Sequence, residues 1–435
     1  MKKLLLLFAL AVVAMSFADF DDVIGSTPHC PSNEIWYTSA YGNIVEPYSG
    51  EGSQDNLAVF GANIVSNKYD ADKDCWVITF DGDVTTIGWC AFYDCSSLTS
   101  ITIPDSVTAI GVSAFNDCRS LTSVTIPDSV TTIGECAFYE CSSLTSVTIG
   151  DSVTTIGDSA FYCCSSLTEF RGKYASEDGR CLIIDGTLNS FAPAGLAEYT
   201  IPDSVTTIGG YAFHECSRLK SVTIPDSVTT IGDYAFCECS SLTSVTIPDS
   251  VTTIGERAFG LCSSLTSVTI PNSVTAIEVG AFAKCKNLTS VIIPDSVTTI
   301  GERAFIECRS LTSITIPDSV TTIGLATFAA CYSLTSVTIP DSVTTIGECV
   351  FAACRSLTSV TIPDSVTSIG ERAFDECGSL TSVYCKATTP PAGGASMFSS
   401  NAYGRKIYVP MESVEAYKSA SRWSIYADSI VGYNF

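Results

Sequence analysis

A block of 23 residues recurs along most of this chain with little change from copy to copy. Its consensus reads SLTSVTIPDSVTTIGERAFxxC. The valine of VTTIG marks twelve copies, with one interruption after the fourth: Val84, Val107, Val130, Val153, Val205, Val228, Val251, Val274, Val297, Val320, Val343 and Val366. A period of about 20–29 residues predicts a solenoid, in which each repeat forms one strand-bearing coil that stacks on its neighbours.

The pattern inside one copy predicts a short strand with one buried face. Leu265, Val268 and Ile270 are apolar, and the last two alternate with Ser267 and Thr269. The Pro-Asp or Pro-Asn that follows ends the strand, because proline lacks the ladder N–H. We therefore expect a β-strand-rich repeat solenoid of the leucine-rich-repeat type, with about 12 regular coils, one degenerate coil, terminal caps and short irregular or helical convex segments.

Stacking places equivalent positions of successive copies in ladders. We interpret the phenylalanine ladder as core rather than as a ligand-stacking surface, because every copy also carries inward Ile and Leu: Phe92, Phe115, Phe138, Phe161, Phe213, Phe236, Phe259, Phe282, Phe305, Phe328, Phe351 and Phe374. We interpret the cysteine ladder as buried thiols rather than bridges, because parallel side chains suit the disulfide torsion poorly: Cys95, Cys118, Cys141, Cys164, Cys216, Cys239, Cys262, Cys285, Cys308, Cys331, Cys354 and Cys377.

The block IPDSVTTIGxxAFxxCxSLTSV resembles the repeat of the BspA-like leucine-rich repeat family of bacterial secreted and surface proteins. The similarity covers nearly the whole chain after its first residues. The resemblance implies a leucine-rich-repeat solenoid and a role in extracellular adhesion or partner binding. It names no ligand.

The amino terminus is typical of a secretory signal peptide, residues 1–18. Lys2 and Lys3 precede a short apolar run, and Ser16-Phe17-Ala18 forms a small-x-small cleavage site. The run is shorter than the about 20 apolar residues that a membrane span needs. We expect an exported protein with no integral membrane segment after cleavage. The sequence indicates a secreted or cell-surface location and leaves the periplasm open.

Composition excludes several classes of function. The chain has 46 acidic against 22 basic residues and a net charge of −24, which repels nucleic acid. The recurring turn aspartate could bind calcium, but we interpret it as a turn residue, because calcium needs several converging oxygens. His29 and His214 are the only histidines, and they lie far apart. We therefore predict no enzyme, no cofactor and no metal site.

The period divides the chain into segments. Residues 19–83 lack it and are expected to form an amino-terminal cap, in which a disulfide between Cys30 and Cys75 is one open pairing. Residues 84–172 hold repeats 1–4, and residues 173–204 form a degenerate coil with a loop and a hairpin turn at Asp185-Gly186. Residues 205–384 hold repeats 5–12. Residues 385–435 form a carboxy-terminal cap.

Binding by such a rod should use the positions that differ between copies. Aromatic residues concentrate there in the earlier copies, and we predict that they contact a partner: Trp89, Tyr93, Tyr139, Tyr162, Tyr211 and Tyr234. The alternative is that they are partly buried against neighbouring coils. A binding protrusion at the degenerate coil is a further possibility.

The predicted function is a binding or adhesion scaffold for an extracellular protein or glycan. The alternative is a structural role without recognition. In that case, the regular Ser/Thr face, of which Ser244 and Thr246 are examples, would order water or ice.

Overall fold

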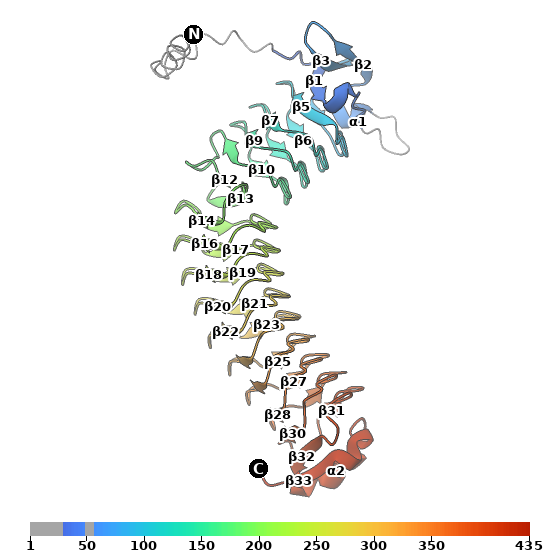
Figure 1. Cartoon of the computed structure of the whole chain (residues 1–435), viewed down its shortest axis with the longest axis vertical. Coiled ribbons are helices and arrows are strands. Elements are labelled where there is room, and N and C mark those ends of the chain that lie inside the picture. Colours follow the sequence, from blue (N-terminus) through green and yellow to red (C-terminus); the bar gives the residue numbers. More distant parts are fainter. Residues whose placement is uncertain (1–28, 48–55) are drawn as a thin grey trace, which may run out of the picture.

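The computed structural model describes residues 29–47 and 56–435. The predicted signal peptide, residues 1–18, lies outside the described residues. The described chain is an elongated, curved stack of coils with the two termini at opposite ends (Figure 1). This confirms the predicted fold class, a strand-rich solenoid of the leucine-rich-repeat type. Within the described ranges, no helix is long and apolar enough to cross a membrane.

The amino-terminal region covers the first coil. Its elements are β1 (Glu34–Ser39), η1 (Ala40–Gly42), α1 (Asn56–Phe60), β2 (Ile64–Asp70) and β3 (Cys75–Phe80). They build a sheet of order β2-β3-β1-β5, in which β1 runs antiparallel to β5 (Leu98–Thr102) of the first coil. Residues 43–45, which follow η1, form no strand.

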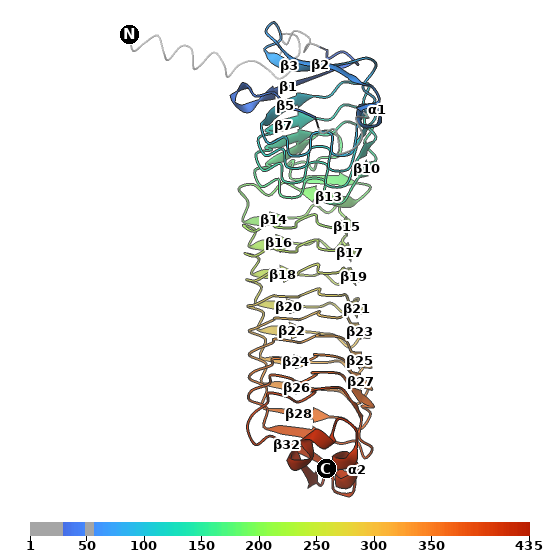
Figure 2. The same ribbon diagram turned by 90° about the vertical axis from the view of Figure 1, so that its right-hand side faces the viewer.

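Each regular coil contributes two short strands, and the strands form two columns along the rod (Figure 2). The first column carries the Ser-Val-Thr strands: β5, β7 (Ser123–Thr125), β9 (Ser146–Thr148), β11 (Glu169–Arg171), β14 (Glu198–Thr200), β16 (Ser221–Thr223), β18 (Ser244–Thr246), β20 (Ser267–Thr269), β22 (Ser290–Ile292), β24 (Ser313–Thr315), β26 (Ser336–Thr338), β28 (Ser359–Ile362) and β30 (Ser382–Cys385). In most of them the central residue is buried and its two neighbours are exposed or half-buried.

The second column carries the Thr-Ile strands: β4 (Thr86–Ile87), β6 (Ala109–Ile110), β8 (Thr132–Ile133), β10 (Thr155–Ile156), β15 (Thr207–Ile208), β17 (Thr230–Ile231), β19 (Thr253–Ile254), β21 (Ala276–Ile277), β23 (Thr299–Ile300), β25 (Thr322–Ile323), β27 (Thr345–Ile346), β29 (Ser368–Ile369) and β31 (Ala392–Gly393). Paired strands in both columns are parallel, and they match equivalent residues such as Val124 and Val147. The repeat therefore sets the pairing register by itself.

The third side of each coil is an irregular turn that carries the Ala-Phe and Cys positions. Two of its residues adopt left-handed backbone angles, as at Cys90 (φ 54°) and Asp94 (φ 55°). Their amides bond to the next coil, Cys90 to the Val112 carbonyl at 3.0 Å and Asp94 to the Asn116 carbonyl at 2.8 Å. The intervening phenylalanine amide does the same. Hydrogen bonds between coils thus offset the conformational cost of the left-handed residues.

The phenylalanine ladder forms the core, as predicted. Phe115 and Phe138 are fully buried, and their parallel rings lie 5.0 Å apart. The ladder cysteines are described as free thiols. The Cys118 thiol donates to the Phe92 carbonyl of the preceding coil at 3.1 Å, and the same contact recurs along the rod. A small apolar side chain with a weak donor suits this slot.

The stack is interrupted after the fourth coil. A hairpin of β12 (Cys181–Ile184) and β13 (Thr187–Phe191) turns at Asp185 and Gly186, both with positive φ. β13 and β14 then pair in parallel with β15 and β16, so they take the places of a regular coil's two strands. We call the coils before the hairpin the amino-terminal stack and those from β13 onward the carboxy-terminal stack. Figure 1 shows the hairpin between them.

The core divides at the same place. Two separate clusters of buried residues meet at the hairpin, which contributes Leu182 and Ile184 to one and Leu188 and Phe191 to the other. Phe161 meets Phe170 edge-on at 5.4 Å, and Phe213 meets Phe191 at 4.6 Å, so the regular ring stacking stops on one side and restarts on the other. The interruption therefore divides the hydrophobic core into two parts, one in each stack.

The carboxy-terminal region closes the rod. It holds β32 (Lys406–Pro410), η2 (Met411–Ser413), α2 (Val414–Ser419), η3 (Ser424–Ser429) and β33 (Ile430–Tyr433). The strands β30, β32 and β33 pair in parallel, which extends the first column. The Trp423 indole is fully buried and donates to the Pro391 carbonyl at 2.7 Å.

Candidate binding site

The predicted aromatic residues divide into two groups. Trp89 and Tyr93 belong to the first coil and are 61% and 45% exposed. The other four are half-buried, which agrees with the alternative reading of partial burial: Tyr139, Tyr162, Tyr211 and Tyr234. These four tyrosines come from both sides of the interruption. They define the candidate site, and the first coil does not belong to it.

The four tyrosines join through His214 into one row of rings. Tyr139 lies 4.9 Å from Tyr162, and Tyr162 meets His214 edge-on at 4.6 Å. The His214 ring lies 5.5 Å from Tyr211, which stacks on Tyr234 at 4.9 Å with an interplanar angle of 4°. We call these five residues the junction strip. It crosses the interruption without a break.

Coil stacking brings together the two tyrosine pairs at the ends of the strip, and the hairpin brings together the residues in its middle. Tyr139 and Tyr162 occupy the slot after Phe in successive copies, while Tyr211 and Tyr234 occupy the second slot before Phe. Tyr162 and His214 are 52 residues apart, which is not a multiple of the period. Their contact depends on the hairpin, and so the sequence pattern did not reveal His214.

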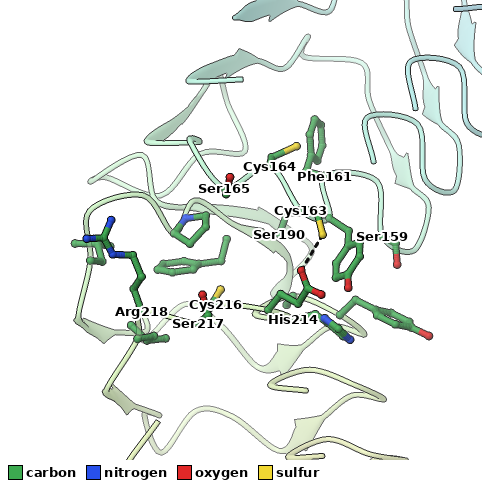
Figure 3. A pocket seen from close by; sticks show the side chains of 18 of the residues that line it. Ser159, Phe161, Cys163, Cys164, Ser165, Ser190, His214, Cys216, Ser217 and Arg218 are labelled. Atoms are coloured by element: carbon green, nitrogen blue, oxygen red, sulfur yellow. Dashed lines mark hydrogen bonds between the residues drawn. The ribbon is translucent and has the colours of Figure 1, made fainter. Parts of the chain in front are cut away.

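A cavity of about 240 Å³ opens beside the strip, between the two stacks. Its lining includes Tyr162, Cys163, Ser190, Tyr211 and Glu215. Figure 3 shows side chains from both stacks around this space, and the dashed line marks the Cys163 thiol donating to Glu215 Oε2 at 2.9 Å. The cavity exists because the two stack ends do not interlock as regular coils do.

Three backbone donors at the cavity wall lack the partner that their position normally has. In the third coil, the amides of Cys136, Phe138 and Glu140 bond to the fourth coil at 2.8–3.0 Å. The equivalent amides of the fourth coil donate to no protein acceptor within the described part of the chain: Ser159, Phe161 and Cys163. All three residues line the cavity. The interruption thus leaves donors available to a bound molecule.

Burial keeps most of the site uncharged. It raises the pKa of Cys163 to about 12, with a further contribution from Glu215. It also raises the pKa of Tyr139 to about 12 and lowers that of His214. A thiol with so high a pKa is not a ready nucleophile at neutral pH. Aromatic faces and hydrogen-bond donors suit recognition better than covalent chemistry.

Other predicted features are located as follows. Cys30 and Cys75 are buried free thiols, so the structure does not contain their disulfide, and the bridge stays a prediction. The turn aspartate can satisfy backbone donors, since Asp128 Oδ1 accepts the Asp151 amide at 2.8 Å. The sequence predicts no metal site, yet the fold brings ligand atoms of His214, Cys237 and Glu238 within 4.8 Å of one another.

The paired columns, the phenylalanine ladder and the 23-residue coil define a leucine-rich-repeat-type solenoid. Residues 63–176, 187–309 and 275–402 match the family described as BspA type leucine rich repeat region (6 copies). These segments cover well over half of the chain, which therefore belongs to the BspA-type leucine-rich repeat family. A comparison with curated proteins finds no match.

Solved structures of bacterial proteins are similar. A leucine-rich repeat protein from Bacteroides ovatus ATCC 8483 is 28% identical with a TM-score of 0.57, covering 94% of this chain and 100% of that one. One from Eubacterium ventriosum ATCC 27560 is 26% identical with a TM-score of 0.52, covering 69% and 82%. A leucine rich cell surface protein from Faecalibacterium prausnitzii A2-165 is 32% identical with a TM-score of 0.43, covering 73% and 92%.

Proposed function

We propose that this chain is an exported recognition protein that binds an extracellular protein or glycan at the junction strip and its cavity. The observation that carries the proposal is the interruption itself. It places a row of aromatic rings beside three backbone donors that have no protein acceptor. Elsewhere along the regular coils the corresponding donors bond to the next coil.

The chemistry of the site fits an elongated ligand with a polar edge. Half-buried tyrosines offer flat apolar faces that cost little conformational entropy on binding. The free amides can donate hydrogen bonds to a carbonyl of an extended peptide or to a hydroxyl of a sugar. Because the chain carries a net charge of −24, we expect a neutral or basic partner surface. The proposal assigns no catalytic step to any residue.

The proposed location is the outside of the cell, either secreted or attached at the surface. This part of the proposal rests on the predicted signal peptide, residues 1–18. Protease treatment of intact producing cells tests it. Degradation of the protein without cell lysis supports surface exposure, and complete protection together with absence from the medium would contradict it.

A binding screen tests the site. The mature protein is applied to a panel of extracellular-matrix proteins and glycans, and the bound members are measured again with a Tyr162→Ala/Tyr211→Ala double variant. Loss of two anchor rings should weaken binding at least about tenfold. Tyr332→Ala is the matched control, because Tyr332 lies in a later coil between Arg309 and Arg355. Equal affinity of the double variant and the control would rule the strip out.

The Ser/Thr face supports a second candidate function. Ser244 and Thr246 are exposed and pair in parallel with Ser221 and Thr223, so hydroxyls repeat at regular spacing. Such an array could order water or ice. Thermal hysteresis of the purified protein would support this role, and freezing at the buffer's equilibrium point would remove it.

A further inference from the structure

Three side chains that commonly bind metal ions converge beside the junction strip. His214 and Cys237 follow Phe213 and Phe236 in adjacent coils, so stacking places one above the other. Glu238 comes next to Cys237, and the ligand atoms of the three residues lie within 4.8 Å of one another. Small rotamer changes can place all three atoms about 2.0–2.3 Å from one zinc ion, the distance that zinc ligands require.

The histidine has an unsatisfied nitrogen. His214 Nδ1 is buried and makes no hydrogen bond. A buried polar atom without a partner is rare and costs free energy, so it calls for an explanation such as a bound ion. The rings of Tyr162 and Tyr211 hold the imidazole in place on two sides. This observation is independent of the clustering of the ligands.

A fourth candidate ligand adjoins the cluster. Glu215 is the next residue after His214, and Glu215 and Glu238 line the same hollow of the surface. Two carboxylates that line one hollow repel each other, and a cation bound between them removes this repulsion. A divalent cation is therefore a natural partner for this pair.

We propose that His214, Cys237 and Glu238, with Glu215 as the fourth ligand, bind one zinc ion that clamps the fifth and sixth regular coils together. One imidazole, one thiolate and carboxylates form a donor set that zinc takes in tetrahedral sites. Binding releases the thiol proton of Cys237. This proposal goes beyond partner recognition and does not depend on it.

Other copies of the repeat show that a coil folds without these metal-binding side chains. The slot of His214 and Cys237 holds Ala283, Ala329 and Ala352 in later copies, and the slot of Glu238 holds Ala330 and Ala353. No other neighbouring pair of copies places two metal-ligating residues in the first slot. Alanine variants at these positions therefore restore residues that the fold already accepts.

Zinc titration of the chelator-treated full chain tests the proposal. We expect one zinc ion per chain in competition with a fluorescent zinc chelator. Loss of a residue that only hydrogen-bonds to a metal ligand typically costs about 10–100-fold in metal affinity. Loss of a ligand itself, in His214→Ala or Cys237→Ala, should therefore weaken zinc binding by at least about tenfold. Cobalt(II) gives a second readout, since a thiolate-to-cobalt absorption band is expected in the wild type and absent in Cys237→Ala.

Cys349→Ser is the matched control, because Cys349 is a half-buried thiol in a distant coil. It should keep both the stoichiometry and the cobalt band. Circular dichroism of the zinc-free variants should match that of the zinc-free wild type, which separates lost metal binding from lost folding. Absence of a one-equivalent zinc site, or equal zinc affinity of the wild type, His214→Ala and Cys237→Ala, would overturn the proposal.

Discussion

Single residues set how closely the coils approach. At Gly134, an added Cβ would lie 2.5 Å from the Gly111 carbonyl carbon and the Val112 nitrogen, both of which are backbone atoms of the preceding coil. Backbone cannot move aside as the end of a flexible side chain can. The glycine of VTTIG is therefore required by packing in most coils. The exceptions are Glu278, which fills the slot in one copy, and Gly324, where an added Cβ would meet no atom closer than 3.6 Å.

Gly134→Ala should consequently lower the free energy of unfolding by about 1–3 kcal/mol, the usual cost of overpacking. Urea unfolding followed by circular dichroism measures it. Gly378→Ala is the control, because nothing lies within 4 Å of an added Cβ there. It should be neutral or slightly stabilising. Equal effects of the two changes would refute the packing explanation.

The ladder thiols make stability depend on pH. Burial raises the pKa of Cys95, Cys141, Cys331 and Cys377 to about 12. In the unfolded chain these thiols ionise near pH 8.5. The folded state holds their protons at a pH where the unfolded state has released them. Their contribution to stability is therefore complete below about pH 8.5 and is lost as the pH rises toward 12.

Each such thiol should lower the free energy of unfolding by about 1.4 kcal/mol per pH unit within that range. Urea midpoints at pH 8 and pH 10 measure the slope. A Cys141→Ala/Cys331→Ala variant should show a shallower slope than the wild type, whatever its absolute stability. Identical slopes would mean that these thiols do not carry the effect.

At the scale of elements, the hairpin closes the end of the carboxy-terminal stack. Phe191 of β13 is buried and packs on Phe213 and Tyr199, with ring centroids 4.6 Å away in both cases. Phe191 thus extends the phenylalanine ladder beyond Phe213, which belongs to the first regular coil of this stack. In a solenoid, stability passes between nearest neighbours, so an unprotected end unfolds first.

Phe191→Ala should therefore lower the free energy of unfolding by about 3–5 kcal/mol. The coils nearest to Phe191 should unfold before the distant ones. Hydrogen exchange resolves this by position. Faster exchange is expected around Phe213, with little change around Phe351. Phe191→Leu, which keeps most of the apolar volume, should show a smaller effect. Uniform acceleration along the whole rod would contradict the end-cap role.

Much of the architecture could be predicted because equivalent positions of successive repeats stack in a column along the rod. The strands, the buried phenylalanines and the buried cysteines followed from the 23-residue period alone. The contact of Tyr162 with His214 did not, because it joins residues 52 positions apart across a hairpin. The proximity of Cys237 to His214 was not predicted either, because the two residues lie one full period apart rather than within a short metal-binding motif.

At the scale of the whole molecule, we propose that the interruption is the functional part of an otherwise regular rod. Repeats bury their faces against one another, and their polar backbone groups are satisfied by the next coil. Where the hairpin interrupts the regular coils, a row of rings, a cavity and free donors come together. Recognition is therefore expected at the junction between the two stacks.

Hydrogen exchange of single amides tests this claim most directly. In the free protein, the amides of Ser159, Phe161 and Cys163 should exchange at least about tenfold faster than the bonded amides of Cys136 and Phe138 one coil earlier. A partner found in the binding screen should slow the first set and leave the second unchanged. Slow exchange of the first set in the free protein, or partner protection confined to other coils, would contradict the account.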